Sequence, residues 1–143
     1  MNPAIPTNPF IGKWIYRSLL NDPNIKTGFD ALEFGRATLD IQEAAPAIVK
    51  GTIGGPGWSL SLHGSFGFGS PMQVRFQGKG TVGDEPWAYD YIGWLVPAWP
   101  NSDASLQRAA IVGSVVRTIP HSNGKGGVSP AGVVASFYAA REN

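Results

Sequence analysis

Hydrophobic and polar residues alternate in short runs along most of this 143-residue chain, and each run ends at turn-forming residues. A period of two is typical of β-strands, and Gly, Pro, Asn and Asp are the residues that interrupt them. Only Asp30–Phe34 and Ser102–Ala110 favour a helical turn or two. The pattern predicts eight strands: Lys13–Leu20, Arg36–Gln42, Ile48–Ile53, Trp58–Phe68, Met72–Thr81, Trp87–Val96, Ala110–Ile119 and Val133–Arg141.

The breaks between these strands are short, so consecutive strands are expected to be antiparallel neighbours in an up-and-down order. Eight such strands form either a closed barrel or a sandwich. Glycines inside several strands, such as Gly64, Gly78 and Gly93, permit the bulges and coiling of a small barrel. We therefore expect an all-β fold, an antiparallel up-and-down barrel of about eight strands with little helix. It would be one domain spanning residues 1–143, with residues 1–11 as a flexible lead.

Composition narrows the function classes. Charged residues make up 15% of the chain, the formal net charge is +1, and Lys and Arg are scattered, which argues against a nucleic-acid or membrane partner. The absence of cysteine excludes disulfides, thiol catalysis and cysteine-based metal sites. Two histidines, His63 and His121, leave little room for a metal centre, and no cofactor is expected. Without a signal-peptide pattern or a long apolar run, the expected location is the cytoplasm.

The segment Gly12-Lys13-Trp14 opens the first predicted strand and resembles the Gly-x-Trp start of calycin barrels, the lipocalin and avidin group. The resemblance implies that Trp14 packs at the closed end of a barrel and that Arg141, in the last strand, covers it. It also implies a barrel that holds a small molecule. The polar pattern of biotin-binding avidins is missing, because Tyr16, Leu20, Ile53 and Gly55 stand at the matching positions.

Candidate ligand contacts gather on the strand Trp87–Val96, the densest aromatic stretch of the chain. Asp90 shares one face of this strand with Ile92 and Trp94, so one carboxylate interrupts an otherwise apolar face. We expect this face to point inward, with Asp90 as a ligand anchor or general base close to Trp94. The alternative is that Asp90 is exposed or forms a structural ion pair, while Trp87, Tyr89 and Tyr91 line the interior.

Other candidates depend on their neighbours. Arg75, on the polar face of the preceding strand, reaches Asp90 if the two lie at similar height, as either a structural ion pair or an anchor. The alternation around His63 argues that it points to solvent. His121 follows a strand end beside a Gly-rich loop, where the rim of a barrel admits ligands, although an ordinary loop histidine is the simpler interpretation.

The leading hypothesis is a small-molecule-binding barrel with an aromatic-lined pocket for a small apolar or aromatic ligand. The runner-up is an enzyme of the cyclase or isomerase type on the same barrel, so enzymatic activity stays open. A third alternative is an interaction module that forms a homo-oligomer through outer aromatic residues. The predicted ligand-binding residues are Asp90, Trp94, Arg75, Tyr16, Tyr89, Tyr91 and His121.

Overall fold

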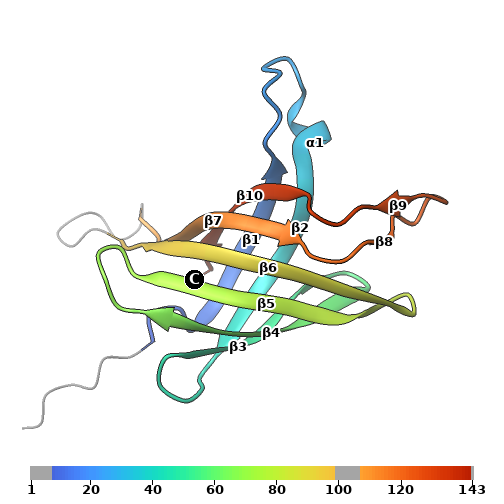
Figure 1. Cartoon of the computed structure of the whole chain (residues 1–143). Coiled ribbons are helices and arrows are strands. Elements are labelled where there is room, and N and C mark those ends of the chain that lie inside the picture. The colour runs from blue at the N-terminus through green and yellow to red at the C-terminus, as the bar shows by residue number, and fades with distance from the viewer. Residues whose placement is uncertain (1–7, 99–106, 143) are drawn as a thin grey trace, which may run out of the picture.

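The computed structural model describes residues 8–98 and 107–142, which form a closed barrel of eight antiparallel strands (Figure 1). Each strand pairs with its neighbours along the chain, and the last strand pairs with the first. The predicted all-β, up-and-down barrel is therefore confirmed. The barrel strands are β1 (Gly12–Leu20), β2 (Glu33–Gln42), β3 (Ile48–Gly55), β4 (Trp58–Gly67), β5 (Gln73–Val82), β6 (Glu85–Val96), β7 (Ala110–Arg117) and β10 (Val134–Arg141).

All eight predicted strands are present, and their bounds differ from the prediction by at most three residues. The helical turn predicted at Asp30–Phe34 corresponds to α1 (Phe29–Leu32), which has four residues. The other predicted helical turn, Ser102–Ala110, lies mostly outside the described residues. The connection between β7 and β10 contains a short hairpin that the alternation did not predict, formed by β8 (His121–Ser122) and β9 (Val128–Ser129).

The two ends of the barrel are built differently, and we call them the mouth and the closed end. The mouth carries the β1–β2, β3–β4, β5–β6 and β7–β10 connections, and the β8–β9 hairpin extends from it (Figure 1). The β5–β6 connection is a two-residue turn in which Gly83 and Asp84 both have positive φ, the conformation that tight hairpins prefer. This turn holds the start of β6 at the rim of the mouth.

The closed end is filled by Trp14 and by residues just before β1. Trp14 is fully buried, and its Nε1 donates a hydrogen bond to the Phe10 carbonyl at 3.0 Å. The Arg141 guanidinium lies 4.3 Å from the centre of the Trp14 ring and donates hydrogen bonds to the carbonyls of Pro9 and Ile11. The arrangement implied by the Gly-x-Trp opening is therefore confirmed. Phe10 is itself fully buried, so residues 8–11 pack onto the barrel.

The barrel interior between the two ends is filled mainly by aromatic and branched side chains from alternate positions of every strand. Near the middle, Phe76 stacks on Tyr91 with ring centres 4.8 Å apart, and Tyr16 packs against Phe137 at 5.4 Å. These rings separate the closed end from the mouth.

Among the described residues, no helix has the length and apolar character needed to cross a membrane.

Candidate functional site

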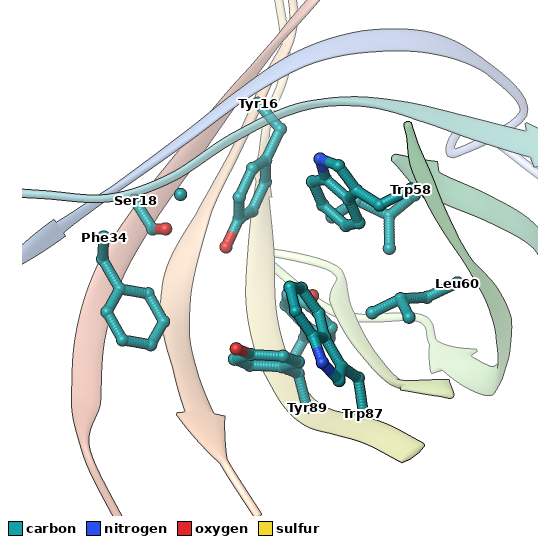
Figure 2. A pocket seen from close by; sticks show the side chains of 10 residues that line it. Tyr16, Ser18, Phe34, Trp58, Leu60, Trp87 and Tyr89 are labelled. Atoms are coloured by element: carbon teal, nitrogen blue, oxygen red, sulfur yellow. The ribbon is translucent and has the colours of Figure 1, made fainter. Parts of the chain in front are cut away.

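A small chamber of about 80 Å³ lies inside the barrel toward the mouth (Figure 2). Its wall is mostly aromatic, and the side chains come from β1, β3, β4, β6 and the start of β2. Figure 2 shows the rings of Trp58 and Trp87 on one side of it and Phe34 on the other. The lining residues are Tyr16, Ser18, Phe34, Gly35, Ile53, Trp58, Leu60, Trp87, Tyr89 and Tyr91.

A wider cavity of about 570 Å³ lies at the rim of the mouth. It shares Phe34, Trp87 and Tyr89 with the inner chamber. The inner chamber alone is smaller than the several hundred Å³ of a typical ligand pocket, whereas the rim cavity has that size. The remaining rim residues come from the β5–β6 turn, the end of β7 and the β8–β9 hairpin: Val82, Gly83, Glu85, Arg117, His121, Ser122, Asn123, Gly124 and Ser129.

The orientation predicted for β6 is wrong. Tyr89 and Tyr91 point into the barrel and are buried, whereas Asp90 is exposed and accepts a 2.7 Å hydrogen bond from Gln77 Nε2 on the outer surface. Trp94, on the same outer face as Asp90, is 37% exposed. The alternative orientation, with Trp87, Tyr89 and Tyr91 lining the interior, is the one that the structure has.

Gly93 explains why the inward face of β6 was difficult to recognise. A side-chain carbon at Gly93 would lie 2.9 Å from Ile111 Cγ2 and 3.0 Å from Phe137 Cζ, so bulky neighbours already occupy that space. The inward face therefore contains a glycine where the strand passes its neighbours closely. The prediction relied on the apolar residues Ile92 and Trp94 beside Asp90, whereas the interior has room only for a glycine at position 93.

Arg75 and Asp90 do not form the predicted ion pair. The cross-strand partner of Arg75 is Ile92, and that of Asp90 is Gln77. Both charged residues instead border a groove of about 450 Å³ on the outer surface of β4 to β7. His63 borders the same groove and is exposed, as predicted. Three predicted ligand contacts, Asp90, Trp94 and Arg75, therefore lie outside the barrel, away from the inner chamber.

The remaining predicted residues meet in or beside the chamber. Tyr16, Tyr89 and Tyr91 line it, and His121 reaches the rim from the β8–β9 hairpin. His121 stacks on Trp87 with ring centres 3.9 Å apart and planes 13° apart. Its Nε2 lies 2.6 Å from the Tyr89 hydroxyl, although the two residues are 32 positions apart in the sequence. The prediction for His121 as a rim residue agrees with this placement.

A chain of hydrogen bonds links the polar groups at this rim. His121 Nδ1 lies 2.8 Å from the Ser122 carbonyl, which only accepts, so Nδ1 carries a proton. His121 Nε2 shares a hydrogen bond with the Tyr89 hydroxyl, and the same hydroxyl accepts a 3.1 Å hydrogen bond from Arg117 Nε. The Glu85 carboxylate in turn accepts from the Ser122 backbone N–H at 3.1 Å.

Two buried donors of the chamber wall lack a hydrogen-bond partner among the described residues. They are Ser18 Oγ, whose side chain is fully buried, and Trp87 Nε1. The Tyr16 phenol lies near Ser18 but outside hydrogen-bonding geometry, and Figure 2 shows both side chains at the chamber. Buried donors normally have partners, because leaving one unpaired costs about 1–3 kcal/mol. The wall therefore offers hydrogen bonds that the protein itself does not use.

Burial controls the protonation of the deeper tyrosines. It raises the pKa of the Tyr16 phenol well above its ordinary value, and the nearby Ser18 hydroxyl offsets only part of that rise. Burial also raises the pKa of Tyr91, with a further contribution from Tyr16. Both phenols stay neutral at physiological pH, so at the chamber they act as hydrogen-bond donors and acceptors without charge.

Several residues at the site were missed by the sequence reasoning. Arg117 was not considered because a charged residue at a strand end usually faces solvent, although it continues the inward alternation of Ile111 and Val115. Ser18 was missed because a small hydroxyl inside a strand gives no distinct pattern. Phe34 precedes the predicted strand Arg36–Gln42, and Trp58 was placed on the apolar face of its strand but not singled out as a ligand contact. Among the described residues no group of three or more His, Asp or Glu side chains is arranged to hold a metal ion.

Comparison of the chain with protein-family models, with curated proteins and with solved structures found no match. The closed eight-stranded barrel and its covered closed end are those that the resemblance at Gly12-Lys13-Trp14 implies.

Proposed function

We propose that this protein is a small-molecule-binding β-barrel whose ligand enters through the mouth and rests against the aromatic wall of the inner chamber. The observation that carries the proposal is the pair of buried, unpaired donors, Ser18 Oγ and Trp87 Nε1, in a chamber otherwise lined by rings. A ligand acceptor atom beside either donor would remove the cost of leaving that donor unpaired.

The size of the two cavities defines how such a ligand sits. A volume of about 80 Å³ admits only a small part of a molecule, and the rim cavity of about 570 Å³ accommodates the rest. Trp87 borders both cavities, so it would contact a ligand that extends from one cavity into the other. Aromatic walls with a few polar atoms are typical of pockets for apolar or aromatic small molecules.

The direct test is binding of a neutral aromatic probe, 2-naphthamide, measured by quenching of tryptophan fluorescence and by calorimetry. We expect Trp87→Leu to weaken the affinity at least about tenfold, which corresponds to 1.4 kcal/mol. Trp94→Leu is the matched control, because Trp94 lies on the same strand but outside the barrel, and its affinity should stay within twofold. Equal losses in the two variants, or no binding to the wild type, would contradict the proposal.

A retained natural ligand is a second test. Native mass spectrometry of the protein purified from its own host should show an added mass that disappears on denaturation. Ordered water in the chamber is the competing explanation for the unpaired donors, because a volume of about 80 Å³ holds a few water molecules. Water alone would give no added mass and no probe binding.

The second candidate is an enzyme of the cyclase or isomerase type, and the specific observation in its favour is the 2.6 Å contact between Tyr89 and His121. A tyrosine that is hydrogen-bonded to a histidine can pass a proton to or from a substrate held beside it. Turnover of a bound ligand, with loss of the reaction in both Tyr89→Phe and His121→Gln, would favour this candidate over binding alone.

A further inference from the structure

The least expected side chain at the mouth is Arg117, the last residue of β7. Its side chain points inward and is only 9% exposed. The guanidinium carbon lies 4.8 Å from the centre of the Phe34 ring and 5.7 Å from that of Tyr89. Cation–π contacts of this kind offset part of the cost of removing the charge from water. They do not supply a negative charge.

The hydrogen bonds of Arg117 leave most of its donors free. Nε donates to the Tyr89 hydroxyl and Nη1 donates to the Pro130 carbonyl, each at 3.1 Å. These two bonds account for two of the five N–H groups of a guanidinium. No carboxylate oxygen of the described residues lies within 4.0 Å of it, and the ion pair found among those residues joins Arg36 and Glu33. Buried charges in proteins are normally paired, so this one lacks a counter-charge.

Arg117 also faces the cavity in which a ligand would sit. It lines the rim cavity together with Phe34, Trp87, Tyr89 and His121, and three of these four rings belong to the wall already described. A molecule whose apolar part rests against Trp87 would therefore present its outer end to the guanidinium. The free N–H groups of Arg117 therefore border the cavity in which a negatively charged ligand group would lie.

We propose that Arg117 binds the carboxylate of a small aromatic acid, with the ring of the acid packed against Trp87 and directed toward the inner chamber. This inference rests on the proposed binding function and specifies its ligand class. The planar guanidinium matches a carboxylate in shape and forms short, charge-assisted hydrogen bonds with it. Such a ligand would supply the negative charge that the described residues do not.

The charges around the cavity favour a single negative charge on the ligand. Glu85 lines the same cavity, and its carboxylate is held by the Ser122 backbone N–H. One guanidinium beside one carboxylate attracts a monoanion more than a dianion, because the second charge of a phosphate monoester would be repelled by Glu85 without a second cation to hold it.

The experiment compares three probes that share one ring system: 2-naphthoate, the neutral 2-naphthamide, and 2-naphthyl phosphate. For the wild type at pH 7.5 we expect 2-naphthoate to bind at least about tenfold more tightly than either of the others. Arg117→Gln should abolish this preference and leave the affinity for 2-naphthamide within twofold. Arg75→Gln, which removes an exposed arginine of the outer surface, is the matched control and should retain the preference.

Each result decides a different point. Equal affinity of the wild type for 2-naphthoate and 2-naphthamide would overturn the anion proposal and leave the binding function intact. Tighter binding of 2-naphthyl phosphate would overturn the assignment to a carboxylate. Binding of none of the three probes would overturn the proposed function as well. Should Arg117→Gln fail to fold, Arg117→Lys keeps the charge but loses the planar fork, and the preference should fall without disappearing. An unchanged preference in Arg117→Lys would contradict a paired, two-point contact.

Discussion

The two ends of this barrel use the same pair of residue types for opposite purposes. At the closed end Arg141 covers Trp14, and at the mouth Arg117 covers Phe34 and Tyr89. At the closed end the protein supplies acceptors: Arg141 donates to two backbone carbonyls and Trp14 Nε1 donates to a third. At the mouth Trp87 Nε1 has no acceptor among the described residues, whereas Arg117, like Arg141, donates two hydrogen bonds and has no carboxylate partner there.

This difference shows how a plug and a pocket are distinguished in a small barrel. An arginine over an aromatic ring does not by itself indicate a site. What separates the two ends is whether the protein satisfies its own buried donors, because unsatisfied donors cost free energy that only a ligand or water recovers. The closed end should therefore contribute mainly to stability, and the mouth mainly to binding.

The largest expected effect is at the closed end. Trp14→Ala should lower the free energy of unfolding by about 3–5 kcal/mol, because Trp14 is fully buried and its removal leaves a cavity. Urea unfolding followed by circular dichroism measures this loss. Trp87→Ala is the comparison at the mouth and should cost clearly less, since Trp87 is only partly buried. Equal losses would remove the distinction between plug and pocket.

The second expected effect concerns the two arginines. Arg141→Gln should lower the free energy of unfolding by about 1–2 kcal/mol, because it removes two hydrogen bonds to backbone carbonyls and the contact with Trp14. Ligand affinity per folded molecule should not change. Arg117→Gln also removes two hydrogen bonds, so what distinguishes it should be weaker binding of 2-naphthoate in the same binding measurements. A binding defect in Arg141→Gln would show that the closed end also shapes the pocket.

The third expected effect is a loss of stability at alkaline pH that originates in the rings between the two ends. Burial raises the pKa of Tyr16 and Tyr91 in the folded protein above the unfolded value near 10. The unfolded chain therefore releases these protons first as pH rises. Their contribution to stability is fully present below pH 10 and decreases above it, by about 1 kcal/mol for each tyrosine at pH 11.

Urea midpoints measured between pH 8 and pH 11 would show this decrease. Tyr91→Phe removes one of the two phenols, so the decrease should become smaller although the ring is retained. The same pH dependence in Tyr91→Phe and in the wild type would contradict the assignment.

The smallest expected effect is that of Asp90. Its hydrogen bond to Gln77 is exposed, so Asp90→Asn should change the free energy of unfolding by less than about 0.5 kcal/mol. Probe affinity should stay within twofold, because the side chain points away from the chamber. A tenfold loss of affinity in this variant would indicate that the outer groove is the binding site.

The strands could be predicted because their signals are local. Turn residues such as Gly54–Gly57 and Gly83–Pro86 mark the strand ends, and alternation marks the faces of β4 and β5. The face of β6 could not be settled this way, because both of its faces carry aromatic residues. The inward face is decided by fit against Ile111 and Phe137 on other strands, where only Gly93 has room.

The candidate site was predicted in part for the same reason. Tyr16, Tyr89 and Tyr91 lie on strands whose inward positions hold large rings, and one of the two parity assignments placed the β6 pair correctly. The contact between Tyr89 and His121 joins β6 to a hairpin outside the barrel, and no local pattern indicates it.

The outer residues Trp94, Val112 and Tyr138 lie in register across three strands and are exposed. The expected homo-oligomer stays a prediction.

The β8–β9 hairpin is not part of the strand pairing that closes the barrel. The barrel closes through direct pairing of β7 with β10, and the hairpin that carries His121 pairs only within itself. One part of the pocket is thus separate from the hydrogen bonds that hold the fold. The proposed binding function therefore predicts that substitutions in residues 121–129 change which molecule binds while the barrel keeps its closure.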